Sequence, residues 1–165
     1  MENTAEWQAL TAADLAVLCG IAGRVHPALP ERAEVFAEKL RLFPAGCLKW
    51  VSGGRMAGYG LAHPWALNSA PGLDAFMYAL PGNAGCLYIH DVALLPEARG
   101  QGAARAFVLY AERLARGRGL GALALVSVYG TGPLWESCGF RPAGTAATGL
   151  ASYGPGAEYM VRSQG

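Results

Sequence analysis

The chain has little charge, no closely spaced cysteines and no long hydrophobic run. Only 15% of its 165 residues are charged and the formal net charge is +1, so the sequence offers neither a basic face for nucleic acid nor an acidic tail. The N-terminus MENTAEWQAL has no apolar signal segment, and no stretch approaches the roughly 20 apolar residues that cross a membrane. We expect a soluble, cytoplasmic protein with no nucleic-acid or membrane partner.

The four cysteines exclude two further kinds of site. Cys19, Cys47, Cys86 and Cys138 lie far apart and form no C-x-x-C pair, which argues against a zinc site and against a redox pair. We expect buried free thiols and no bound metal. At 165 residues the chain suits one domain, 1–165, with a core of its own.

The first half predicts two helices and a hairpin. Thr11, with Asp14 three residues on, caps a helix over 12–23, and a second helix opens at Pro30 and ends before Pro44. Strands CLKWVS and RMAGYGLAH then flank a Gly-Gly pair, which is typical of an antiparallel hairpin. The Pro- and Gly-rich segment 64–85 predicts a long loop with a helical turn around 73–80; such loops often bind ligands.

The second half predicts a β-α-β unit. CLYIHDVALL reads as a strand, GAARAFVLYAERLAR as a helix closed by Gly117, and ALALVSV as a nearly all-apolar strand. The two strands should lie parallel inside the sheet. A short helix in GTGPLWESCGF and a last strand at EYMVR follow.

The junction LLPEARGQGAARAF, Leu94 to Phe107, has the features of an anion-binding turn. It lacks the Gly-Lys-Ser/Thr of a P-loop, and its glycines lack the third member of the dinucleotide fingerprint, so dinucleotide binding is a distant alternative. Backbone N–H groups from Gly100 to Ala104 at a helix N-terminus would instead converge on a pyrophosphate. Arg99 adds a guanidinium beside them.

Two motifs and the order of the elements carry a family resemblance. RGQGAA, 99–104, resembles the acetyl-coenzyme A (acetyl-CoA) pyrophosphate motif of the GNAT N-acetyltransferase superfamily, and LWESCGF, 134–140, resembles its later Leu-Tyr-x-x-x-Gly-Phe signature. A first strand near Trp7, two helices, a hairpin and a final strand follow the family order, so the resemblance covers most of the chain.

The resemblance implies an α/β GNAT fold: a mixed, mostly antiparallel sheet flanked by helices, with a splayed parallel strand pair. It also implies transfer of an acetyl group from acetyl-CoA to a primary amine by direct attack, without metal or covalent enzyme intermediate. The acceptor would be a small-molecule or peptide amine, and a homodimer stays open. The alternative is a non-catalytic acyl-CoA sensor that keeps the fold.

The resemblance also assigns residues to the donor. The pyrophosphate would lie against Arg99, Gly100, Gln101, Gly102, Ala103 and Ala104. Val92, Ala93 and Leu94 would hold the pantetheine arm, with a backbone N–H directed at the thioester carbonyl.

His90 is the candidate base, because an imidazole titrates near neutral pH and some GNAT amine acetyltransferases carry a catalytic histidine at this position. Asp91 points to the opposite side of an ideal strand and joins His90 only if a bulge intervenes. Tyr88 shares the face of His90 and lines the acceptor pocket or the core.

One position departs from the family pattern. Trp135 stands where many members have a tyrosine that protonates the leaving thiolate, and an indole is no practical acid. Tyr129 is a candidate substitute or a wall residue. Tyr59, His63 and Trp65, at the end of the hairpin, are candidates for an aromatic acceptor wall, with core packing as the alternative for each. His26 receives no role.

Overall fold

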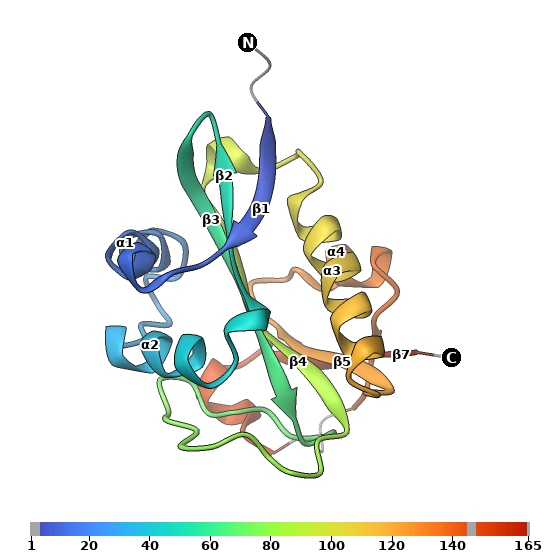
Figure 1. Ribbon diagram of the computed structural model, residues 1–165. Helices are drawn as coiled ribbons and strands as arrows, with labels where there is room; N and C mark the ends of the chain where they lie inside the picture. Colours follow the sequence, from blue (N-terminus) through green and yellow to red (C-terminus); the bar gives the residue numbers. More distant parts are fainter. Residues whose placement is uncertain (1–3, 145–147, 165) are drawn as a thin grey trace.

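A mixed sheet forms the centre of the protein, a computed structural model of which describes residues 4–144 and 148–164 (Figure 1). Within this part of the chain seven strands lie in the order β1-β2-β3-β4-β5-β7-β6. Only β4 and β5 are parallel neighbours, and the other pairs are antiparallel, as the sequence predicts. The strands are β1 (Ala5–Ala9), β2 (Cys47–Ser52), β3 (Arg55–Trp65), β4 (Cys86–Leu94), β5 (Ala122–Ser127), β6 (Arg141–Pro142) and β7 (Glu158–Ser163).

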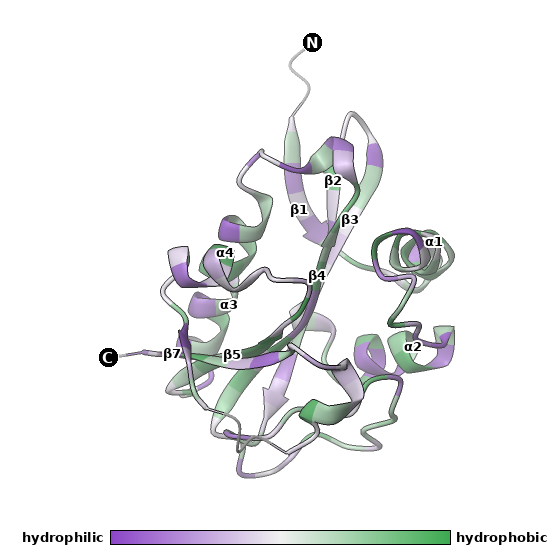
Figure 2. Ribbon diagram, turned by 180° about the vertical axis from the view of Figure 1, so that it is seen from behind, coloured by the Kyte–Doolittle hydropathy of each residue, from purple (hydrophilic) through white to green (hydrophobic). Residues whose placement is uncertain are grey.

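Helices cover both faces of this sheet. α1 (Leu15–Val25) and α2 (Ala33–Leu42) lie on one side, and α3 (Ala103–Gly117) and α4 (Gly132–Ser137) on the other (Figure 1). Phe107 of α3 packs with Leu123 in one core cluster, whereas Leu18 of α1 and Phe36 of α2 pack against Tyr59 in another. In Figure 2, α3 carries both hydrophilic and hydrophobic residues, whereas β5 is mostly hydrophobic.

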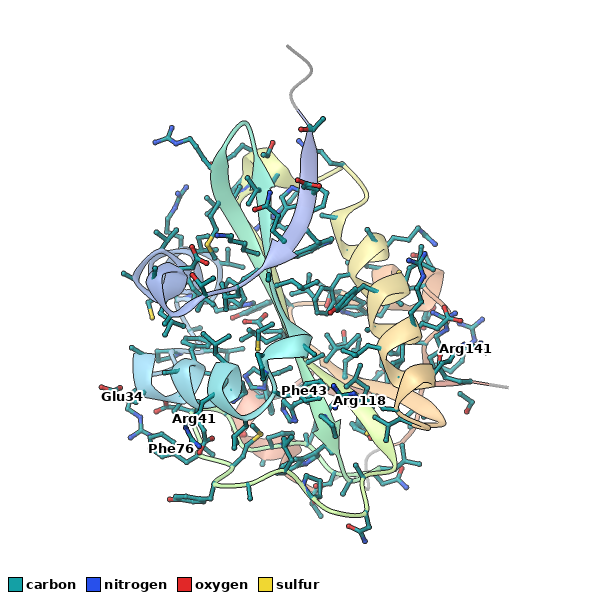
Figure 3. All side chains as sticks on the ribbon, in the orientation of Figure 1. Glu34, Arg41, Phe43, Phe76, Arg118 and Arg141 are labelled. Carbon is teal, nitrogen blue, oxygen red and sulfur yellow. The ribbon has the colours of Figure 1, made fainter. Side chains whose placement is uncertain are left out.

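The two helical layers contact each other at one end. The guanidinium of Arg118, just after α3, lies 4.8 Å from the ring centroid of Phe43, just after α2. Both side chains are labelled in Figure 3. This cation–π contact joins the segments that follow α2 and α3.

The first helix confirms its predicted cap, but the second begins later than predicted. The Thr11 N–H donates to the Asp14 carboxylate at 2.8 Å before α1. α2 starts at Ala33 rather than Pro30, because Arg32 has extended backbone and its N–H and guanidinium both donate to Asp74. Residues 30–32 therefore hold the long loop instead of forming a first helical turn.

The helical turn predicted around 73–80 is wrong. Residues 71–84 contain no helix and are mostly irregular backbone with isolated turns and a bend. A carboxylate of the preceding helix takes N–H groups that a helix would use internally. The Glu38 carboxylate accepts from the N–H of Met77 at 2.6 Å and of Tyr78 at 2.9 Å. The loop is thus fastened to α2.

β4 carries the two irregularities that shape the site. In its register with β3, Leu61 faces Asp91 and Ala62 faces Ile89, so His90 is the additional residue of a β-bulge. On its other side β4 pairs with β5 only over 87–89, against 123–125. Beyond Ile89 the two parallel strands separate.

Candidate active site

Where β4 and β5 separate, the described residues enclose a cavity of about 440 Å³. Asp91, Val92 and Leu94 line it from β4. Val126 and Val128, at the end of β5, line the opposite side. Strand backbone that has lost its parallel neighbour is therefore next to open space.

The glycine-rich junction lies at one end of this cavity. Arg99 and Ala104 line it, and Gly100 and Gly102 both have φ of +77°, the left-handed region that glycine tolerates. A Cβ at either glycine would reach no atom within 4 Å. No side chain caps the N-terminus of α3, so its first N–H groups are free of a side-chain acceptor in the described chain. The junction has the free donors, the positive helix end and the room that a pyrophosphate requires.

A buried histidine–carboxylate pair lies elsewhere along the same cavity. His90 Nε2 lies 2.8 Å from Glu31 Oε1, and the two side chains are only 1% and 5% exposed. Burial by itself raises the pKa of Glu31, but the nearby His90 and Lys39 outweigh it and lower the pKa to about 2. The Glu31 carboxylate is therefore ionised and accepts from Nε2–H, which leaves Nδ1 without a partner among the described residues.

A second pair lies beside the first. His26 Nε2 is 2.9 Å from Asp91 Oδ1, and the Tyr59 hydroxyl donates to Asp91 Oδ2 at 2.6 Å. Burial alone lowers the pKa of His26, but the hydrogen bond and charge of Asp91, with a contribution from Glu31, raise it overall. The bulge at His90 brings Asp91 into the same cavity, the exception that the alternation rule allowed.

Trp135, the residue that departs from the family pattern, already donates a hydrogen bond within the protein. Trp135 is buried, and its Nε1–H donates to Thr131 Oγ1 at 3.2 Å. The Thr131 hydroxyl in turn donates to the Val128 carbonyl at 2.7 Å. Tyr129 lines the cavity with 56% of its surface exposed, and its ring stacks on His26 at a centroid distance of 5.6 Å.

The side chains predicted as an acceptor wall lie elsewhere. Tyr59 is fully buried and lines a smaller cavity of about 240 Å³ next to α1 and α2, which shares His26 and Asp91 with the large one. His63 and Tyr88 are buried in the protein, and neither they nor Trp65 line either cavity. Their role in acceptor binding stays a prediction.

Sequence reasoning missed Glu31 and His26. Glu31 is 59 residues from His90, and His26 is 65 residues from Asp91. Neither residue belongs to a motif, and the β-bulge that directs Asp91 towards His26 leaves no mark in the alternation of β4. The only local signal was a histidine and a glutamate flanking two prolines between the first two helices.

None of the helices described has both the length and the apolar character needed to cross a bilayer. A comparison with curated proteins found no match.

Solved structures give the fold clear relatives at low identity. The GNATL loading domain of CurA from Lyngbya majuscula superposes with a TM-score of 0.80 at 11% identity, covering 98% of each chain. A GNAT-like decarboxylase, GphF, in complex with isobutyryl-CoA gives 0.76 at 15%, covering 97% of this chain and 100% of that one. The ribosomal-protein-S18-alanine N-acetyltransferase from Escherichia coli gives 0.69 at 19%, covering 98% and 94%.

The sequence itself carries the family assignment. Residues 12–140 match the sequence model of the acetyltransferase (GNAT) family, a span that includes α1, the hairpin, the bulged strand, the glycine junction and α4. With the splayed β4–β5 pair and the structural likenesses, this match shows that the chain belongs to the acetyltransferase (GNAT) family.

Proposed function

We propose that the protein is an N-acetyltransferase that moves an acetyl group from acetyl-CoA to a primary amine. One observation carries the proposal: a single cavity extends from the uncapped glycine junction to two histidine–carboxylate pairs. The junction would bind the donor, and the pairs would manage the protons that an amine must lose and a thiolate must gain.

The donor would lie along the open edge of β4. Arg99 to Ala104 would hold the pyrophosphate, with Gly100 and Gly102 allowing close approach of the backbone. Val92 to Leu94 would hold the pantetheine arm, since Val92 and Leu94 line the cavity beyond the last parallel pairing. When bound, acetyl-CoA supplies the acetyl group as a thioester. A backbone N–H of this segment would stabilise the oxyanion that forms on attack.

His90 would act as the base. A free alkylamine has a pKa of about 10.4 and is mostly protonated at neutral pH, so attack requires loss of a proton. Glu31 occupies Nε2 of His90, so in the neutral imidazole the lone pair lies on Nδ1, which would accept that proton directly or through water. The acceptor would be a small-molecule or peptide amine that reaches the cavity near these side chains.

Structural similarity to GNAT proteins does not by itself indicate acetyl transfer to an amine, because one similar protein is named a GNAT-like decarboxylase. Others are named N-acetyltransferases, including the S18-alanine enzyme. The proposal therefore rests on the two histidines in the cavity. The alternative is an acyl-CoA sensor, favoured by one observation: Trp135 replaces the family tyrosine and its N–H is already used by Thr131.

Thiol release separates these functions. The protein is incubated with acetyl-CoA and a panel of primary amines, including amino acids, polyamines and peptides with a free N-terminus. An enzyme gives amine-dependent release of free thiol and an acetylated amine by mass spectrometry. A sensor binds acetyl-CoA with no amine-dependent release, which would overturn the proposal.

A further inference from the structure

We propose that His26 is the proton donor of the site: Asp91 holds its Nε2, and Nδ1 gives a proton to the sulfur as the thiolate leaves. This inference deepens the proposed acetyl transfer and rests on it. It assigns the role that Trp135 cannot take.

The donors around the cavity leave few choices. Among the lining side chains that the structure describes, three already donate a hydrogen bond to an acceptor within the protein. Trp135 donates to Thr131, Thr131 to the Val128 carbonyl, and Tyr153 to the Pro71 carbonyl at 2.8 Å. Arg99 donates through Nε to the Leu94 carbonyl, and a guanidinium does not release a proton at neutral pH. His90 is required as the base. His26 and Tyr129 remain.

Acid strength separates these two. Burial and the charge of Asp91 raise the pKa of Tyr129 above the ordinary value of 10.0, whereas a thiol has a pKa of about 8.5. Proton transfer from this phenol to a thiolate is therefore less favourable than from a tyrosine of ordinary pKa. An imidazolium is a stronger acid than a thiol, so its proton transfer to the thiolate is downhill.

The surroundings of His26 supply that imidazolium. It faces Asp91 of β4, to which Tyr59 of β3 also donates, and Glu31 lies close enough to add a favourable charge. Arg99 opposes the charge, and the neutral ring of Tyr129 stacks on the imidazole. Together these groups raise the pKa of His26, so more of it is protonated at neutral pH. Nδ1 is buried and has no partner among the described residues.

The protons then balance. The neutral amine nitrogen forms a bond to the carbonyl carbon and then gives a proton to Nδ1 of His90, while the carbon–sulfur bond breaks and sulfur takes the proton of His26 Nδ1. His90 passes the proton it accepted to solvent, as it does the proton that an ammonium acceptor loses before attack. Asp91 orients the ring through its hydrogen bond to Nε2. His26, whose side chain is 16% exposed, regains a proton from solvent after each turnover.

The contact with sulfur is tested without turnover. The histidine nitrogens of the protein labelled with ¹⁵N are followed by NMR during titration with CoA and, separately, with desulfo-CoA, which lacks the sulfur; His26→Gln assigns the resonance. We expect Nδ1 of His26 to shift with CoA and to shift much less with desulfo-CoA, and Tyr129→Phe to keep this difference. Equal shifts with the two ligands would remove His26 as donor while leaving the CoA site in place.

The proton itself is tested with a better leaving group. His26→Gln should lower kcat with acetyl-CoA by about 100-fold or more, the usual worth of a general acid, and should regain most of that loss with the acetyl selenoester of CoA, because a selenolate leaves without protonation. The matched variant His90→Gln should lose activity with both donors. Equal losses for His26→Gln with the two donors would contradict the assignment.

Discussion

At the scale of single residues, the site depends on two carboxylates that no motif identifies. Glu31 and Asp91 each hold one nitrogen of a histidine and leave the other nitrogen directed at no described group. This arrangement fixes which nitrogen exchanges protons with a substrate. A histidine on the central strand is visible in the sequence, but its tautomer is decided by a partner from a distant segment.

Glu31→Gln tests this positioning. The glutamine amide has nearly the same shape as the carboxylate but no charge, and it can present either its oxygen or its NH₂ group to Nε2 of His90. The share of His90 with the proton on Nε2 should therefore fall, and kcat should drop about tenfold or more. NMR of the histidine nitrogens reads the tautomer, and steady-state kinetics read kcat. KM for acetyl-CoA should change little.

Glu38→Gln is the matched control for this variant. Glu38 also fastens the 66–85 loop through backbone N–H groups, as Glu31 does through that of Asp74, but it makes no hydrogen bond to His90. Normal His90 tautomers and normal kcat are expected in Glu38→Gln. If both variants lose kcat to the same extent, the effect comes from the loop and not from His90.

His63 predicts a pH dependence of stability. Burial is the main cause that lowers its pKa from 6.5 to about 3, so the unfolded chain binds a proton at a pH where the folded protein does not. The contribution of neutral His63 to the free energy of unfolding is fully present above pH 6.5. It is lost as the pH falls towards 3, by up to about 5 kcal/mol. Urea unfolding at pH 7, 5.5 and 4.5 should show the decline.

The variant His63→Phe should flatten this decline, because phenylalanine binds no proton. If the wild type and His63→Phe lose stability in parallel between pH 7 and 4.5, the titration of His63 is not its source.

At the scale of elements, the glycine junction was predictable and the bulge was not. The turn from β4 to α3 uses glycines where φ is positive, and glycine is the residue that signals such backbone in a sequence. The bulge at His90 leaves no comparable signal, since any residue can occupy it. It nevertheless determines that His90 and Asp91 face one cavity. The late start of α2 escaped prediction for a similar reason: residues 31 and 32 contact distant partners.

Gly102→Ala tests the junction as a unit. The Cβ would strain a residue at φ +77° and occupy the open space in front of the helix N-terminus. We expect a loss of about 1 kcal/mol in stability and a rise of about tenfold in Kd for CoA, measured by calorimetry.

Gly119→Ala supplies the control at the other end of α3. Gly119 has φ +69° and equally open surroundings, so it should show the same loss of stability with an unchanged Kd. Equal effects of the two variants on Kd would mean that the junction does not contact the donor.

At the scale of the whole molecule, the order of the elements was predicted well because a β-α-β unit and a hairpin have strong local signals. The cavity was not predictable, because it depends on where β4 and β5 stop pairing.

The separation of β4 and β5 opens the cavity in which CoA is proposed to bind. CoA at 100 times its Kd should stabilise the fold by about 2.7 kcal/mol and raise Tm by roughly 5–10 °C, whereas NAD should leave Tm unchanged. Stabilisation by NAD alone would contradict CoA binding.

Amine-dependent thiol release is the most direct measurement, with wild type and His90→Gln compared at matched occupancy by acetyl-CoA. The wild type should release thiol in proportion to acetylated amine, and His90→Gln should keep its affinity for CoA while kcat falls about 100-fold or more. Binding of acetyl-CoA without release for any amine, or an unchanged kcat in His90→Gln, would contradict acetyl transfer with His90 as the base.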